Sequence, residues 1–185
     1  MQPLVILDRD GVINQDSDEY IKTPEEWEAI PGSLEAIARL TQSGYRVVVA
    51  TNQSGLARGL FNIDALNKIH EKMHRHLSMI GSSVEAIFFC PHAPKAACAC
   101  RKPKPGLFQD IALRLGVNLT GVPAIGDSLR DLQAAAAVGA RPMLVRTGKG
   151  RMTEVHLADK GFAEVEVYED LAAAVSHLLL QGQEK

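Results

Sequence analysis

The sequence predicts an α/β protein in which a Rossmann-like parallel sheet carries helices on both faces. Short runs rich in β-branched residues alternate along the chain with amphipathic helical stretches, the order expected when crossover helices join parallel strands. One such run, Tyr45–Ala50, is of the kind found in strands buried on both faces. We expect residues 1–185 to form a single domain, because the chain is long enough for one full hydrophobic core.

The elements of the first half follow from apolar runs and from helix start and stop signals. Leu4–Leu7 is a run of four apolar residues and is predicted to be a strand. Ser33–Ser43 is predicted to be a helix because its apolar residues recur at helical spacing and Gly44 follows as a stop. After the Tyr45–Ala50 strand, Asn62 can cap a helix from about Ile63 to Ile80. Its expected core stripe is Leu66, Ile69, Met73, Leu77 and Ile80.

The second half repeats this alternation. Ala86–Cys90 is the third predicted strand, and a loop rich in proline and cysteine leads to a helix from about Leu107 to Leu115. A short strand, Pro123–Ile125, precedes a helix over Asp131–Val138 that ends at a glycine. The remaining elements are two strands, Pro142–Val145 and Glu164–Tyr168, and a closing helix, Leu171–Leu180.

Composition argues against several classes of protein. The formal net charge of -2 shows no excess of basic residues that could bind a polyanion, so we expect no nucleic-acid partner. The early apolar run ends at Asp8, so we expect neither a signal peptide nor a membrane span, and no membrane partner. The three cysteines lie close together beside a histidine, which favours a metal site in a reducing compartment over disulfides. We therefore expect a cytoplasmic protein. We also expect the chain to be a monomer.

Polar motifs follow four of the predicted strands. They are Asp8-x-Asp10-Gly11, Thr51-Asn52-Gln53-Ser54-Gly55, Arg101-Lys102-Pro103 and Gly126-Asp127-Ser128-x-x-Asp131. Each alone is as consistent with an ordinary turn as with a functional site. Ligands of parallel α/β sheets bind at the carboxyl ends of the strands. The four motifs in this order therefore predict one site.

The residue types in these motifs suit phosphate chemistry. Two aspartates this close raise each other's pKa unless a cation lies between them, and Mg2+ takes oxygen ligands and commonly shares a phosphate oxygen. With the charge of Asp8, Asp10 and Asp127 offset by Mg2+ and Lys102, Asp8 could attack phosphorus and form an aspartyl-phosphate. Asp10 could protonate the leaving oxygen and later deprotonate the hydrolytic water, while Thr51 holds the phosphoryl oxygens.

The segments LDRDGVIN, VVVATNQSG, CRKPKPG and IGDSLRDLQAA resemble the haloacid dehalogenase superfamily of phosphatases, from the first strand to about Thr147. Within it, TNQSGLARGLF, CPH and CACRKPKPG resemble the D-glycero-D-manno-heptose 1,7-bisphosphate 7-phosphatase family. The resemblance implies a haloacid dehalogenase-like fold and an enzyme that removes one phosphate from a sugar bisphosphate. The product is used to make the nucleotide-activated heptose of lipopolysaccharide core or surface polysaccharide.

The resemblance also implies roles for individual residues. Asp8 would be the nucleophile, Asp10 the proton donor, and Thr51 and Lys102 the groups that stabilise the phosphoryl group. Mg2+ would be held by Asp8, Asp127 and the main-chain carbonyl of Asp10. The expected substrate-binding residues are Asp16, Asn52, Gln53, Ser54, Arg101 and Lys102.

Two departures from the family pattern and two alternative functions stand beside this interpretation. The stretch 16–20 is one residue longer than usual, and Ser128 stands where some members carry a substrate-gripping lysine. Histidinol-phosphate phosphatases share the general plan, but their second motif usually lacks the run found here at 54–59. A phosphoacceptor module that keeps its aspartyl-phosphate needs no acid/base two residues after the nucleophile, where Asp10 stands.

Cys90-x-His92 and Cys98-x-Cys100 supply four ligands, the number that a structural Zn2+ site requires. We expect this zinc loop, residues 90–100, to position Arg101 and Lys102. A second metal-like pattern, HEKMH at 70–74, fits the H-E-x-x-H of zinc proteases. Because His70 and His74 flank the core stripe of their helix, we expect them to be solvated and not catalytic.

The connections between elements are too short for a cap domain. Residues 11–44 hold one loop and one helix, and residues 55–100 hold one helix, one strand and the zinc loop. We therefore expect an open site, lined by residues 14–30, residues 54–59 and the zinc loop. The segment LVRTGKG, 144–150, could cradle a phosphate or form a flexible loop; the pattern leaves both open.

Overall fold

A computed structural model of the chain describes residues 2–183, in which six strands form one sheet. The strands are β1 (Leu4–Leu7), β2 (Arg46–Asn52), β3 (Ala86–Cys90), β4 (Pro123–Gly126), β5 (Arg141–Val145) and β6 (Glu166–Tyr168). Their order is β3-β2-β1-β4-β5-β6 and every pairing is parallel. The chain winds outward from β1 in one direction and from β4 in the other, so the crevice between β1 and β4 is the expected ligand site.

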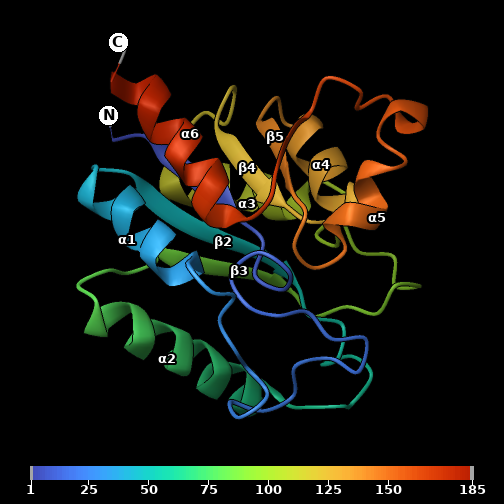
Figure 1. The fold of residues 1–185 in the computed structure, drawn as a ribbon. Coiled ribbons are helices and arrows are strands. Elements are labelled where there is room, and N and C mark those ends of the chain that lie inside the picture. The colour runs from blue at the N-terminus through green and yellow to red at the C-terminus, as the bar shows by residue number, and fades with distance from the viewer. Residues whose placement is uncertain (1, 184–185) are drawn as a thin grey trace.

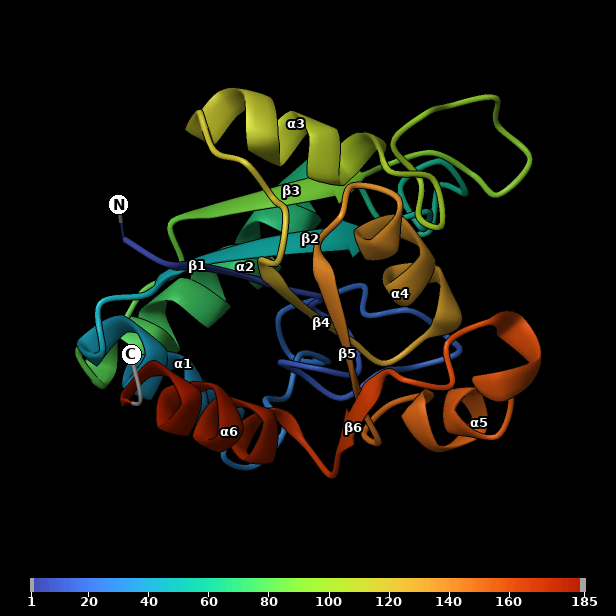
Figure 2. The same cartoon turned by 90° about the horizontal axis from the view of Figure 1, so that it is seen from above.

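Helices cover both faces of this sheet, as the sequence predicts (Figures 1 and 2). The helices α1 (Ser33–Gln42), α2 (Ile63–Met79) and α6 (Leu171–Gln183) contribute to one apolar cluster. The helices α3 (Gly106–Leu115) and α4 (Leu129–Ala136) contribute to a second. In Figure 2, α3 lies on the opposite side of the sheet from α1 and α6.

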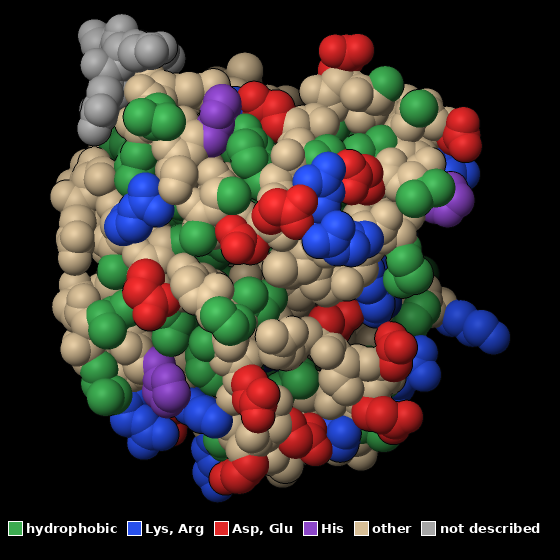
Figure 3. All heavy atoms as spheres, in the orientation of Figure 1, with side chains coloured by type: hydrophobic (Ala, Val, Ile, Leu, Met, Phe, Trp, Pro, Cys, Tyr) green, Lys and Arg blue, Asp and Glu red, His purple; other side chains and the backbone are tan. Residues whose placement is uncertain are grey.

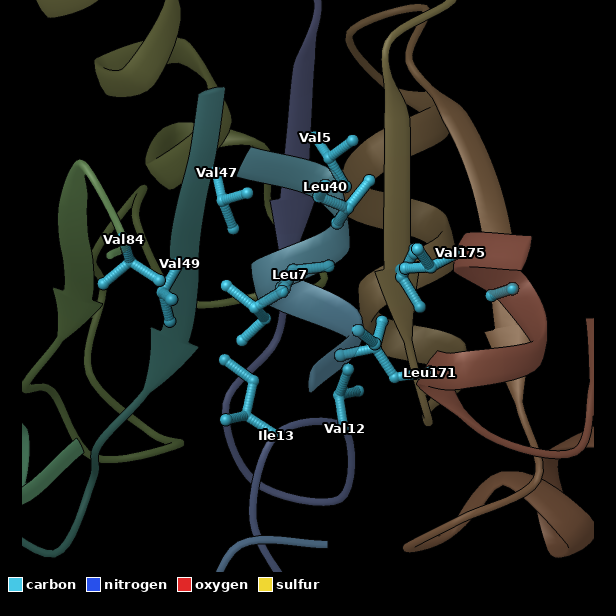
Figure 4. Close-up of a cluster of buried hydrophobic side chains, with 14 of the residues drawn as sticks. Val5, Leu7, Val12, Ile13, Leu40, Val47, Val49, Val84, Leu171 and Val175 are labelled. Atoms are coloured by element: carbon cyan, nitrogen blue, oxygen red, sulfur yellow. The ribbon is translucent and has the colours of Figure 1, made fainter. Parts of the chain in front are cut away.

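The strand β1 shows why the sheet has two cores. Side chains alternate between the faces of a strand, and Val5 and Leu7 belong to the first cluster while Leu4 and Ile6 belong to the second. All four are buried. Figure 4 shows the first cluster, in which Leu40 of α1 and Val175 of α6 lie over this face of the sheet. The rigid central strand carries Asp8 at its carboxyl end.

Sequence reasoning missed two short elements and misjudged one core residue. The helix α5 (Gly150–Glu154) and the 3-10 turn Ala158–Lys160 lie where no regular structure was predicted. Helices this short are set by tertiary contacts rather than by propensity, and here Thr153 Oγ1 donates a hydrogen bond of 2.9 Å to the Asp127 carbonyl. The prediction that Ile80 is a core residue is wrong: it lies just beyond α2 and is 39% exposed.

The long connection from β1 to α1, residues 8–32, contains only turns and isolated bridges. It packs against α2, where Lys72 Nζ donates hydrogen bonds to the carbonyls of Pro24 (2.7 Å) and Trp27 (2.8 Å). Trp27 is 1% exposed. This connection is therefore a fixed wall of the site and not a separate cap.

No helix within residues 2–183 has the length and hydropathy needed to span a membrane. On the face drawn in Figure 3, acidic and basic side chains are interspersed, with no large patch of one sign.

Candidate active site

A pocket of about 250 Å³ opens at the carboxyl ends of the central strands. The four motifs singled out in the sequence all contribute to it. From these motifs the lining residues are Asp8, Asp10, Thr51, Asn52, Gln53, Ser54, Arg101, Lys102, Asp127, Ser128 and Asp131. Residues from the first connection and from the loop after β5 complete the lining: Asp16, Ser17, Asp18, Tyr20, Ile21 and Lys149, together with Arg130 of α4.

Lys102 lies between two carboxylates at the base of this pocket. Its Nζ is 3.0 Å from Asp8 Oδ1 and 2.6 Å from Asp131 Oδ1, and it also donates a hydrogen bond of 2.7 Å to the Ala50 carbonyl. Burial lowers the pKa of Lys102, but Asp131 and Asp8 outweigh this and raise it to about 12. The ammonium is therefore charged and held beside Asp8.

The carboxylates outnumber the cations here, and their pKa values show the imbalance. Burial, followed by Asp131, raises the pKa of Asp8 well above its usual value in spite of Lys102. Burial and Asp131 likewise raise the pKa of Asp127 to about 7. Carboxylate oxygens of Asp8, Asp127 and Asp131 lie within 4.8 Å of one another. A hard divalent cation would offset this repulsion and finds the oxygen ligands that it prefers.

The loop after β5 holds Asp127 against the first motif. The backbone N–H of Lys149 donates a hydrogen bond of 2.8 Å to Asp127 Oδ2. A Cβ at Gly11 would lie 2.1 Å from that oxygen, and one at Gly148 would lie 2.2 Å from it. Both glycines also have positive φ values. The loop after β5 therefore reaches the site; whether it cradles a phosphate stays a prediction.

Asp10 is held by a separate set of donors. Arg9 Nη2 donates hydrogen bonds to Asp10 Oδ1 (2.9 Å) and Oδ2 (3.2 Å), Asn14 Nδ2 donates to Oδ1 (2.9 Å), and Gln53 Nε2 donates to Oδ2 (2.9 Å). Burial raises the pKa of Asp10, but Arg9 and these hydrogen bonds outweigh it, so that its pKa is lowered. Asp8 and Asp10 thus sit in opposite environments although they are two residues apart.

Residues 51–54, at the end of β2, orient their neighbours. Gln53 Nε2 donates a hydrogen bond of 2.9 Å to Thr51 Oγ1 as well as to Asp10. Asn52 makes two reciprocal hydrogen bonds of 3.1 Å with the backbone of Lys102. Ser54 is buried at the pocket edge. The amides of Asn52 and Gln53 are therefore already engaged within the protein.

The entrance of the pocket carries the predicted residues Asp16 and Arg101. It also carries Lys149, from the segment considered as a phosphate cradle, and Arg130, which sequence reasoning missed. Lys149 Nζ lies 3.1 Å from Asp16 Oδ2, which ties the loop after β5 to the first connection. Arg101 makes one long hydrogen bond, 3.5 Å, to the His92 carbonyl. Burial, followed by the charge of Arg130, lowers the pKa of Arg101. Burial also lowers the pKa of Lys149, but the acidic partner Asp16 outweighs burial and Arg130, so that this pKa is raised. The three cations line the same pocket.

The four predicted zinc ligands meet beside this entrance. Cys90 Sγ lies 3.5 Å from His92 Nδ1, 3.8 Å from Cys98 Sγ and 3.1 Å from Cys100 Sγ. Ligand atoms around a tetrahedral zinc are separated by about 3.5–3.8 Å. Burial and Cys100 raise the pKa of Cys90 to about 12, a cost that a bound cation would remove. The donor set fits Zn2+.

The comparisons with known proteins point to one activity. A HAD-hydrolase-like family model matches residues 99–174. The chain is 63% identical over 180 residues to the D-glycero-beta-D-manno-heptose-1,7-bisphosphate 7-phosphatase of Bordetella bronchiseptica, covering 97% of this chain and 99% of the relative. It is 50% identical over 176 residues to the enzyme of that name from Pseudomonas aeruginosa, covering 95% and 97%. The chain belongs to this family of phosphatases, in the haloacid dehalogenase superfamily.

Solved structures of heptose bisphosphate phosphatases share the fold. The B. bronchiseptica enzyme, crystallised with magnesium and phosphate, has a TM-score of 0.92 and 62% identity, over 97% of this chain and 99% of that one. The enzyme from Burkholderia thailandensis has a TM-score of 0.75 and 48% identity, over 96% and 99%. The fold and the family predicted from the sequence are both confirmed.

Against this family background, the structure corrects one expectation and adds residues that sequence reasoning missed. His70 is not solvated but buried, with Nε2 3.2 Å from Arg9 Nη1, because the first connection folds over α2; His74 is exposed as expected. Asp131 is the last residue of the motif that begins at Gly126, but the sequence alone assigned it no catalytic or binding role. Its capping-box spacing from Ser128 was the available signal. Lys149 lies four residues after the end of β5, within the segment 144–150 already considered as a phosphate cradle, but was given no role of its own.

Proposed function

We propose that this chain removes the 7-phosphate of D-glycero-D-manno-heptose 1,7-bisphosphate, through an aspartyl-phosphate and with Mg2+, on the route to nucleotide-activated heptose for lipopolysaccharide or surface polysaccharide. The observation that carries the proposal is that both aspartates of the first motif line one pocket with the buried Lys102. Asp8 lies against Lys102, and Asp10 is fixed by Arg9, Asn14 and Gln53. The β anomer, which the names of the relatives specify, is the proposed substrate.

In the first step a carboxylate oxygen of Asp8 attacks the phosphorus of the 7-phosphate. Lys102 and the backbone N–H of Arg9 already contact Oδ1 of Asp8, so Oδ2 is the oxygen available for attack. The bond from phosphorus to the sugar oxygen breaks, and Asp10 gives its proton to that oxygen. The pKa of Asp10 is lowered in the free site, and the negative charge of an incoming phosphate ester favours the proton that it must carry.

In the second step Asp10, now a carboxylate, takes a proton from water, which attacks the phosphorus of the aspartyl-phosphate. Phosphate leaves and the Asp8 carboxylate is restored. Mg2+ would be held by Asp8, Asp127 and the carbonyl of Asp10, and would neutralise charge on the phosphoryl oxygens. Thr51 and Lys102 would bind those oxygens. Asp16, Asn52, Gln53, Ser54 and Arg101 would border the substrate, Asn52 and Gln53 chiefly by orienting Lys102 and Asp10.

We further propose that Cys90, His92, Cys98 and Cys100 hold a structural Zn2+. The closed set of four ligands leaves no position for substrate, so the metal would act on the loop alone. The loop is linked to the phosphate-binding segment by the hydrogen bond from Lys104 Nζ to the Cys98 carbonyl, 2.7 Å, and by Arg101. The net charge of -2 and the interspersed charges on the face drawn in Figure 3 argue against a nucleic-acid partner. We also propose a single-domain cytoplasmic monomer that does not bind membranes.

The test is phosphate release from heptose 1,7-bisphosphate of each anomer, with histidinol phosphate as the alternative substrate. Asp8→Asn should abolish turnover because an amide cannot attack phosphorus, and Asp10→Asn should lower it by about 10²–10⁴-fold. Asp110→Asn, at an exposed ion pair on α3, is the matched control and should keep wild-type rates. Near-normal turnover by Asp8→Asn would rule out the aspartyl-phosphate, and a preference for histidinol phosphate would overturn the substrate assignment.

A further inference from the structure

His70, on α2, contacts Arg9, the arginine that holds the acid/base residue Asp10. Its Nε2 lies 3.2 Å from Nη1 of Arg9, 61 positions away in the chain. The Arg9 side chain is fully buried and His70 is 9% exposed. The proposed mechanism uses neither side chain directly, although Arg9 lies between Asp8 and Asp10 in the first motif.

The chemistry of the two side chains determines which of them donates. A guanidinium has only donors, so Nε2 of His70 must accept and the ring proton must be on Nδ1. Burial, with the adjacent charge of Arg9, lowers the pKa of His70 to about 3. The ring is therefore a neutral acceptor at physiological pH.

Arg9 connects this ring to Asp10, because its guanidinium contacts both side chains. Its Nε and Nη2 donate hydrogen bonds to Asp10 Oδ1 at 3.1 and 2.9 Å, while Nη1 points to His70. The guanidinium is planar, so a contact at Nη1 restricts rotation of the whole group and of the carboxylate paired with it. His70 is itself held by α2, whose residues Ile69 and Met73 are fully buried, and by the ring of Phe89, 6.4 Å away between centroids.

We propose that His70 is a positioning residue for the reaction: through Arg9 it holds the Asp10 carboxylate in the orientation that proton transfer requires. The inference rests on the proposed function, in which Asp10 protonates the leaving oxygen. It differs from a purely structural role, in which His70 would only satisfy a buried arginine and its loss would affect all substrates alike.

Two substrates separate these roles. Heptose 1,7-bisphosphate releases an alkoxide that needs a proton from Asp10, whereas p-nitrophenyl phosphate releases a weakly basic phenolate that does not. For His70→Leu we expect kcat/KM to fall about ten- to a hundred-fold for the bisphosphate and less than about threefold for the aryl ester. His70→Gln keeps an acceptor of similar reach and should recover most of the loss. His74→Leu, one turn along the same helix and exposed, should match the wild type.

The outcomes decide between the explanations. Equal losses on both substrates, or no loss in His70→Leu, would overturn the positioning role, as would failure of His70→Gln to recover activity while its melting temperature equals that of the wild type. Asp10→Asn, assayed on the same pair, tests the proposed function separately. If that variant kept full activity on the bisphosphate, the acid/base assignment itself would fail, whatever His70 does.

Discussion

Asn52 and Lys102 are joined by two reciprocal hydrogen bonds, in which the Asn52 side chain donates to the Lys102 carbonyl and accepts from the Lys102 N–H, each at 3.1 Å. The pair fixes the backbone from which Lys102 reaches Asp8. A side chain that the sequence assigned to substrate binding therefore serves first to position a lysine.

Replacing Asn52 with Asp should impair catalysis more than binding. The carboxylate can still accept from Lys102 N–H but repels the Lys102 carbonyl, so the ammonium moves relative to Asp8. We expect kcat to fall about ten- to a hundred-fold with a smaller change in KM. Steady-state kinetics with heptose bisphosphate measure both kcat and KM. Asn67→Asp, at an exposed position on α2, is the control. A rise in KM with unchanged kcat would show that Asn52 binds substrate and does not position Lys102.

Arg101→Ala should reduce the preference for a bisphosphate. Lys102 serves the reacting phosphate, while Arg101 lines the entrance and has only one long hydrogen bond, to the His92 carbonyl. Losing a charge-assisted contact costs about 1.5–3 kcal/mol, or about ten- to a hundred-fold in kcat/KM. A small monophosphate ester should lose much less. The ratio of the two kcat/KM values is the measurement, with Arg114→Ala as the control; equal losses would place Arg101 in the phosphoryl-transfer step.

Purified protein should contain one zinc per chain, and Cys98→Ser should lower both the zinc content and the melting temperature. Because the metal would organise the loop, we expect a drop of at least about 5 °C, with catalysis reduced secondarily through Arg101 and Lys102. Elemental analysis and thermal unfolding measure the two effects. His74→Ala, in the protease-like pattern, should keep its zinc. Fully reduced protein that lacks zinc yet melts at the same temperature would contradict the site.

The burial of His70 should make stability depend on pH. Its folded pKa is about 3 and its unfolded pKa is near 6.5. Between these values the unfolded chain binds more protons than the folded one. The His70 contribution is therefore complete above about pH 6.5 and decreases as the pH falls toward 3.

We expect a slope from this residue of at most about 1.4 kcal/mol per pH unit between pH 6 and 5. The difference between the wild type and His70→Gln isolates it, since both chains share every other titrating group. Urea unfolding at pH 7, 6 and 5 gives the two curves. Parallel curves would show that His70 titrates alike in the folded and unfolded chain, and would contradict its lowered pKa.

The fold class, the order of the elements and the meeting of four motifs could be predicted from the sequence because each depends on local pattern. Apolar runs mark strands, and strands joined by helices run parallel. Polar residues placed just after such strands then have to share one edge of the sheet. Asp8, Thr51 and Asp127 lie in one pocket for this reason, and Lys102 joins them from beyond the loop that follows β3.

The contacts of individual side chains required the tertiary structure. Helical spacing placed His70 beside the core stripe, and only the packing of residues 8–32 over α2 turned it from solvent toward Arg9. The short helix α5 exists because Thr153 bonds to the Asp127 carbonyl and Glu154 pairs with Arg146. Such contacts join residues far apart in the chain or in neighbouring loops. Local periodicity carries no information about them, and they determine how Asp10 and Asp127 are held.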